Sequence, residues 1–244
     1  MTHAVTPGAA DFTTYQMGET PAPSLLDDKT ARRLRGFGLL GILSILIIFI
    51  GNVVLLPGSA LLVLLWARLS GTPWRELGFV RPKSWIRTIA TGILFGFAFK
   101  FLMKAIVMPL LGADPINQAY HYLAGNLSAV PLTLYLLIAG AGFGEETFFR
   151  GYAFERLGKL FGDSIVAKIS IVLLTSIWFG LAHYSVQGVA GTEQATIVGL
   201  LFGTIFAFTG RLFMLMIAHA AFDLTAYGMI YWNLETAVAH FVFK

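Results

Sequence analysis

From Arg32 to Leu69 the chain is almost entirely apolar, and this stretch is too long for one membrane crossing. A single crossing takes about 20 helical residues. The segment GNVVLLPG at 51–58 contains Gly, Asn and Pro, which are turn residues. The stretch therefore predicts two helices, over 33–51 and 54–69, that cross a bilayer and return.

The composition agrees with a membrane protein. Of the 244 residues, 57% are hydrophobic and 12% are charged, whereas an ordinary soluble domain is about 25% charged. So few charges cannot cover a water-facing surface. The formal charge of +4 does not indicate nucleic acid, because the basic residues lie beside apolar segments. The chain has no cysteine, which excludes disulfides and thiolate chemistry.

The remaining apolar segments predict five more helices, over 86–111, 130–158, 164–184, 194–210 and 212–232. The predicted fold class is therefore all-α, a polytopic transmembrane bundle of about seven to eight helices. The predicted domains are a flexible polar N-terminal tail (1–32), a transmembrane domain (33–232) and a short C-terminal tail or interfacial helix (233–244).

Charge at the helix ends predicts the orientation. Basic residues precede the first helix pair and follow it, whereas the loops 112–128 and 185–193 contain no Lys or Arg. Because cytoplasmic loops carry the excess of Lys and Arg, both basic clusters and the N-terminus should be cytoplasmic. The segment 72–85 is then a cytoplasmic loop or an interfacial segment.

Several charged or ionisable side chains interrupt the apolar helices. A charge in the hydrocarbon costs about 2.5–3.5 kcal/mol on insertion scales, and such residues usually face the bundle interior. They come from three separate segments: Glu145, Glu146 and Arg150; His183; and His219 and Asp223. We expect Glu145, His183, His219 and Asp223 to converge in one cavity.

The spacing of these residues indicates which share a helix face. Residues four apart lie on one face, which predicts a Glu146–Arg150 ion pair. Glu145 is turned by about 100° from Glu146 and can meet another partner. The same spacing relates Phe179 to His183 and His219 to Asp223.

Two His and several carboxylates suit hydrolysis by either of two routes. The set could bind Zn²⁺ with a water in the open position. Alternatively, a Glu and a His could activate water without metal, while His219 donates to the oxyanion. Buried polar groups that only hold helices together, or an ion transporter, are other interpretations of the same residues.

Two further patterns involve helix faces. Lys100 and Lys104 lie four apart on the predicted third helix, where they snorkel, face a wet cavity, or contact substrate or lipid. Gly92 with Gly96, and 199 with 203, have the GxxxG spacing that lets helices approach closely.

The three ionisable motifs resemble those of the CPBP family of intramembrane proteases, which includes type II CAAX prenyl endopeptidases and Abi proteins. That family carries EExxxR, then FxxxH, then HxxxN or HxxxD. Here they read EETFFR (145–150), FGLAH (179–183) and HAAFD (219–223), in the same order. The segment RELGFVRPKSW also resembles the family's sequence before these motifs.

The resemblance implies a role for each motif residue. Glu145 matches the catalytic glutamate and His183 its water-activating partner, while His219 and Asp223 match the pair that stabilises the transition state or binds metal. Glu146, Arg150 and Phe179 match supporting positions. Where the family has Asn an amide could donate to an oxyanion, but an ionised Asp only accepts. Asp223 therefore favours metal ligation or orientation of His219.

The expected function is an intramembrane endopeptidase of metallo- or glutamate type, acting on a membrane-associated peptide or protein within the lipid bilayer. Zn²⁺ is the candidate cofactor, with Glu145, His183, His219 and Asp223 as its ligands. The expected location is the bacterial inner membrane. The alternative is a non-catalytic membrane protein of the same fold, such as a bacteriocin immunity factor, receptor or assembly partner.

Overall fold

A computed structural model describes residues 25–54 and 57–243, and this part of the chain is helical with no strand. The predicted all-α membrane bundle is confirmed. Four helices are long and apolar enough to cross a membrane: Trp85–Leu110, Leu127–Phe161, Ile165–Thr209 and Phe213–Tyr231. A bent pair, Asp28–Arg35 with Leu39–Asn52, passes the same test as one broken span. Residues 1–24 of the predicted N-terminal tail lie outside the described residues.

The N-terminal helices differ from the prediction at their start. They are α1 (Asp28–Arg35), α2 (Leu39–Val54) and α3 (Gly58–Ser70). Helix α1 begins inside the predicted tail, and the chain bends by 60° before α2. The single helix predicted over 33–51 is therefore wrong, because the sequence GFG at 36–38 interrupts it.

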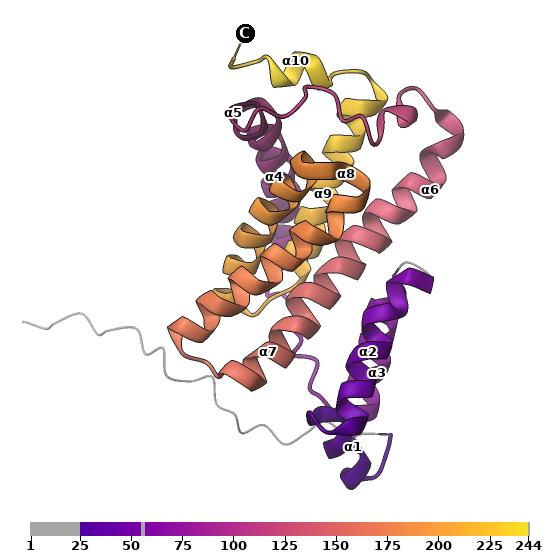
Figure 1. The fold of residues 1–244 in the computed structure, drawn as a ribbon, viewed down its shortest axis with the longest axis vertical. Helices are drawn as coiled ribbons and strands as arrows, with labels where there is room; N and C mark the ends of the chain where they lie inside the picture. The colour runs from indigo at the N-terminus through magenta and orange to yellow at the C-terminus, as the bar shows by residue number, and fades with distance from the viewer. Residues whose placement is uncertain (1–24, 55–56, 244) are drawn as a thin grey trace, which may run out of the picture.

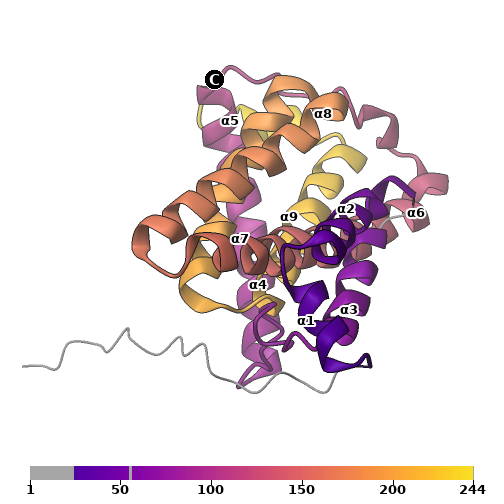
Figure 2. The same ribbon diagram turned by 60° about the horizontal axis from the view of Figure 1, so that its bottom comes forward.

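Helices α2 and α3 form the predicted pair that runs out and back (Figures 1 and 2). Their connection is closed by two reciprocal hydrogen bonds. The backbone N–H of Asn52 donates to Ser59 Oγ at 3.0 Å, and the backbone N–H of Ser59 donates to Asn52 Oδ1 at 2.9 Å. Helix α3 has 13 residues and is shorter than a full crossing.

The other helices form the body of the bundle in Figure 1. They are α4 (Trp85–Leu102) with its continuation α5 (Met108–Leu110), α6 (Val130–Tyr135), α7 (Phe154–Phe161), α8 (Ile165–Thr209), α9 (Phe213–Tyr231) and the short α10 (Glu235–Ala239). The α10 helix lies within 233–244, where the sequence predicted a short tail or an interfacial helix.

The segment between α6 and α7 is a π-helix, η4 (Leu136–Ala153), rather than the predicted α-helix. Its hydrogen bonds run from i to i+5, and such turns are frequent at functional sites. Glycines are frequent in this segment and weaken its preference for α-helix. This wider helix carries the EETFFR motif.

The two helices predicted over 164–184 and 194–210 correspond to the two halves of helix α8. Its backbone leaves the helical region at Gly188, where φ is 62°, a conformation that favours glycine. The loop predicted over 185–193 is therefore reduced to a tight turn. The two halves pack together, since a Cβ on Gly199 would lie 2.9 Å from Ser176 Cα.

Close packing also joins α4 to α9. A Cβ on Gly96 would lie only 2.1 Å from the carbonyl oxygen of Ala218, and one on Gly92 would lie 2.8 Å from Ile217 Cγ2. The close approach predicted from the GxxxG spacing is thus present. It sets the position of α9, which carries two of the candidate site residues.

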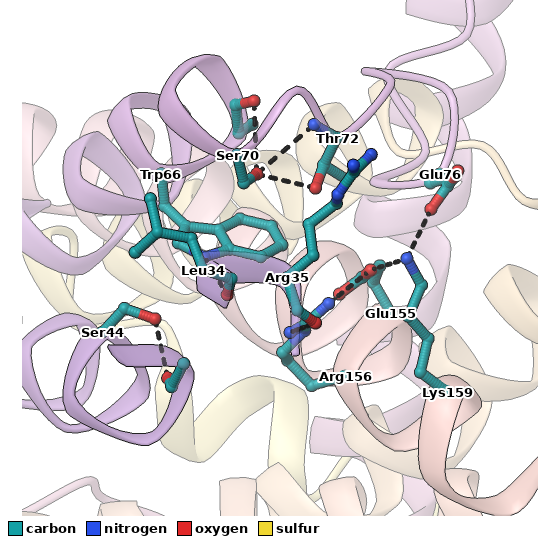
Figure 3. A network of polar contacts seen from close by, with 12 residues as sticks. Leu34, Arg35, Ser44, Trp66, Ser70, Thr72, Glu76, Glu155, Arg156 and Lys159 are labelled. Carbon is teal, nitrogen blue, oxygen red and sulfur yellow. Dashed lines mark hydrogen bonds and ion pairs between the residues drawn. The ribbon is translucent and has the colours of Figure 1, made fainter. Parts of the chain in front are cut away.

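A polar network fastens α1 and the loop after α3 to α7 (Figure 3). Arg156 Nη1 donates to the carbonyl oxygen of Arg35 at 2.8 Å, and its guanidinium also pairs with Glu155. Lys159 Nζ lies 2.8 Å from Glu155 Oε1 and 3.1 Å from Glu76 Oε2. The end of α1, the loop after α3 and α7 therefore lie together at one end of the bundle.

Candidate active site

Three ionisable residues from two helices meet inside the bundle. His219, on α9, is 4% exposed. Its Nε2 atom lies 3.7 Å from Glu145 Oε2, on η4, and 3.7 Å from Asp223 Oδ2, one turn further along α9. The structure thus brings together Glu145, His219 and Asp223, as the sequence predicted.

The other ring nitrogen of His219 contacts Glu146, which is fully buried. Glu146 Oε1 accepts a hydrogen bond from His219 Nδ1 at 2.7 Å and one from Arg150 Nη1 at 2.8 Å. A carboxylate only accepts, so Nδ1 carries a proton. The Glu146–Arg150 pair agrees with the prediction. The contact with His219 was not predicted, and it gives Glu146 the orienting role considered for Asp223.

His183 lies at the end of the first half of α8. Its Nδ1 atom lies 2.8 Å from the carbonyl oxygen of Phe179 on the same helix. A carbonyl oxygen only accepts, so Nδ1 carries a proton, and Nε2 is the nitrogen that has the lone pair when the ring is neutral. His183 therefore presents a base or a ligand atom.

A cavity of about 270 Å³ unites these groups. Its wall includes Glu145, Phe179, His183, His219 and Asp223. Glu145 Oε2 is buried and has no hydrogen-bond partner among the described residues. The cavity therefore exposes a carboxylate oxygen and an imidazole lone pair to whatever enters it.

Aromatic rings support the polar groups. The guanidinium carbon of Arg150 lies 4.8 Å from the centre of the Phe179 ring, which also makes an edge contact with the His183 ring at 4.7 Å. Phe202, which the sequence did not single out, stands perpendicular to the His219 ring at 5.8 Å. Phe179, predicted as a supporting position, thus packs against both polar groups, and these contacts restrict rotation of both imidazoles.

The cavity wall also contains polar residues that the motifs do not include. Gln187 Nε2 donates to the hydroxyl of Tyr120 at 3.4 Å, and both residues line the cavity. Burial raises the pKa of the Tyr120 hydroxyl, so it stays protonated at neutral pH. Lys100 also lines the cavity, which agrees with one of the interpretations that its position on a membrane helix suggested.

The side chains do not form a ready metal site. Within residues 25–54 and 57–243, no group of three or more His, Cys, Asp or Glu side chains is placed to hold a metal ion. The two carboxylates nearest to His219 Nε2 are each 3.7 Å from it. As placed, this donor set does not fit zinc, and the zinc site stays a prediction.

Comparison with known proteins gives one family. Residues 126–225 match the family described as type II CAAX prenyl endopeptidase Rce1-like, which is a protease family. All three motifs lie inside the matched segment. No curated protein and no solved structure matched the chain. The resemblance to the type II CAAX prenyl endopeptidases is thereby confirmed over residues 126–225, the segment that contributes every one of the predicted site residues.

Proposed function

We propose that this protein is an intramembrane endopeptidase that hydrolyses a peptide bond of a membrane-associated substrate with water activated by Glu145. One observation carries the proposal. His219 is held by Glu146 through one ring nitrogen and faces Glu145 and Asp223 with the other, at the wall of a cavity. The family match supports the class of reaction.

Glu145 is the general base in this mechanism. Its buried Oε2 atom takes a proton from a water molecule in the cavity as the water attacks the scissile carbonyl. The same carboxyl then gives the proton to the leaving amine. His183 accepts a hydrogen bond from the water through Nε2, since its Nδ1 atom is already bound to a backbone carbonyl. That contact orients the water.

His219 stabilises the oxyanion. The mechanism uses its imidazolium form, in which Nδ1 donates to Glu146 and Nε2 donates into the cavity. Asp223 accepts only, so it holds the ring by charge rather than donating to the oxyanion. Arg150 pairs with Glu146 and fixes the position of its carboxylate. Three groups therefore contact the reactants, Glu145, His183 and His219, whereas the buried pair Glu146 and Arg150 supports them.

The proposed location is the bacterial inner membrane, with the N-terminus in the cytoplasm. The apolar helices support a membrane location. The position of the basic residues beside α1 and α7 supports the orientation. The proposed substrate is a peptide or protein held in the same bilayer.

Glu145→Gln tests the mechanism directly. We expect hydrolysis of a membrane peptide by the purified protein to fall by about 10²–10⁴-fold, with an unchanged melting temperature. Glu76→Gln is the matched control, because Glu76 lies at the basic end of the bundle and pairs with Lys159. Full activity in Glu145→Gln would make the non-catalytic alternative the leading interpretation.

A further inference from the structure

A second cavity adjoins the catalytic one. Its volume is about 480 Å³, and its wall includes residues of the segment 113–119 and Glu235 of α10. Lys100, Gln187 and Gln194 line both cavities. A substrate that reaches Glu145 therefore has room to continue past these three side chains into the second cavity.

Lys100 is the buried cation at this junction. It is 6% exposed, and its Nζ atom donates to Gln194 Oε1 at 2.8 Å. The ammonium also lies 4.8 Å from the centre of the Phe222 ring. Both contacts are with uncharged groups. An ammonium has three donors, and burying it away from an opposite charge is costly.

Lys104, one turn further along the same helix, provides the contrast. Its Nζ atom lies 3.0 Å from Glu235 Oε1 and donates to the carbonyl oxygen of Pro115 at 2.5 Å. Asp114, which also lines the second cavity, accepts one hydrogen bond from the backbone N–H of Ile116 and one from Gln118 Nε2. The charge of Lys104 is thus matched by Glu235, and Asp114 is hydrogen-bonded within its own turn, whereas Lys100 has no carboxylate at ion-pair distance among the described residues.

We propose that Lys100 is a substrate-binding residue that receives a carboxylate of the peptide substrate at the junction of the two cavities. This inference rests on the proposed function and names a specificity determinant for it. A carboxylate fits the site because it supplies the missing charge and acceptors for the free donors of the ammonium. It comes either from the free C-terminus of the substrate or from an acidic side chain near the cleaved bond.

A purely structural role for Lys100 makes a different prediction. In that role the ammonium only offsets the charge of Asp223, which lines the catalytic cavity as Lys100 does. Removing it would then weaken the binding of every peptide equally. In the proposed role, removal erases the preference for peptides that carry the carboxylate. The ratio of the dissociation constants of matched peptides, with and without the carboxylate, therefore distinguishes the two roles.

The experiment uses three fluorescein-labelled apolar hexapeptides in detergent micelles: a free acid, its C-terminal amide, and an amide with Glu in place of the last residue. Dissociation constants are measured on the full chain with Glu145→Gln, which holds the peptide uncut. We expect the free acid or the Glu peptide to bind about 10- to 100-fold more tightly than the plain amide. Which of them binds tightly identifies the source of the carboxylate.

Lys100→Met in the same background should reduce that ratio to about 1. Lys104→Met is the matched control and should keep the ratio, because its cation is already paired with Glu235. A retained ratio in Lys100→Met, equal binding of all three peptides, or no binding of any peptide would overturn the subsite. Cleavage of the same peptides is tested with the wild type. If the Glu145→Gln protein shows a clear carboxylate preference but the wild type cleaves none of the peptides, the proposed hydrolysis is overturned and the subsite remains.

Discussion

Glu146 and His219 are 73 residues apart in the sequence, yet Glu146 Oε1 accepts a hydrogen bond of 2.7 Å from His219 Nδ1. The same oxygen pairs with Arg150 at 2.8 Å, and all three side chains are buried. One carboxylate therefore holds the ring of a candidate catalytic residue and neutralises a buried guanidinium. Different variants can therefore test its contact with His219 and its pairing with Arg150 separately.

Glu146→Ala should unfold the protein more easily, because it leaves the charge of Arg150 buried and unpaired. Breaking a buried ion pair by removing one partner costs about 3–5 kcal/mol. The measurement is the free energy of unfolding, or the melting temperature, of purified protein in detergent. Glu145→Ala serves as the comparison and should melt close to the wild type, since Glu145 faces the cavity.

The double variant Glu146→Leu with Arg150→Met separates folding from catalysis. Replacing both partners with apolar side chains of similar volume should restore most of the lost stability. It should not restore hydrolysis, because His219 then lacks the acceptor that fixes its ring. An active double variant would show that Glu146 serves only as a structural partner of Arg150.

Metal removal tests the zinc prediction. We expect hydrolysis to survive dialysis against a chelator, because the described donors form no group of three that could hold a metal. Metal analysis of the wild type and His183→Ala gives the second measurement. Stoichiometric zinc in the wild type that is absent from His183→Ala would contradict this expectation and support a metalloprotease.

The convergence of the site could be predicted because ionisable side chains in apolar helices must avoid lipid. That rule brings Glu145, His183, His219 and Asp223 to one cavity, although their catalytic roles stay predictions. The contact between Glu146 and His219 could not be predicted. Helical periodicity relates residues within one helix, whereas a partner on another helix depends on how the two helices are rotated and packed.

The main features of the fold missed by sequence analysis are local changes of backbone geometry. The bend after α1, the π-helix η4 and the turn at Gly188 all occur where the chain contains glycine. Hydropathy detects how long an apolar segment is, but not whether its hydrogen bonds run to i+4 or i+5. A single glycine with positive φ can also replace a predicted loop, as Gly188 does.

The orientation in the membrane is tested with reporter fusions. We expect a fusion at the N-terminus and one within the loop 72–84 to report the cytoplasm, since basic residues gather at this end of the bundle. A fusion in the turn near Gly188 should report the opposite side. Reporters that place the N-terminus and the 72–84 loop on opposite sides would show that α2 and α3 together make one crossing.

Because α4 packs closely on α9, a methyl group added to α4 should disturb the candidate site. A Cβ on Gly96 would lie 2.1 Å from the carbonyl oxygen of Ala218, the residue before His219. Gly96→Ala should therefore push α9 away, lower the free energy of unfolding by about 1–3 kcal/mol and reduce hydrolysis by displacing His219. Gly203→Ala is the matched control, because its Cβ would meet its nearest neighbours at 3.5 Å, an ordinary contact. Melting temperature and hydrolysis are measured on both variants, and equal behaviour of the two would show that the α4–α9 contact does not position His219.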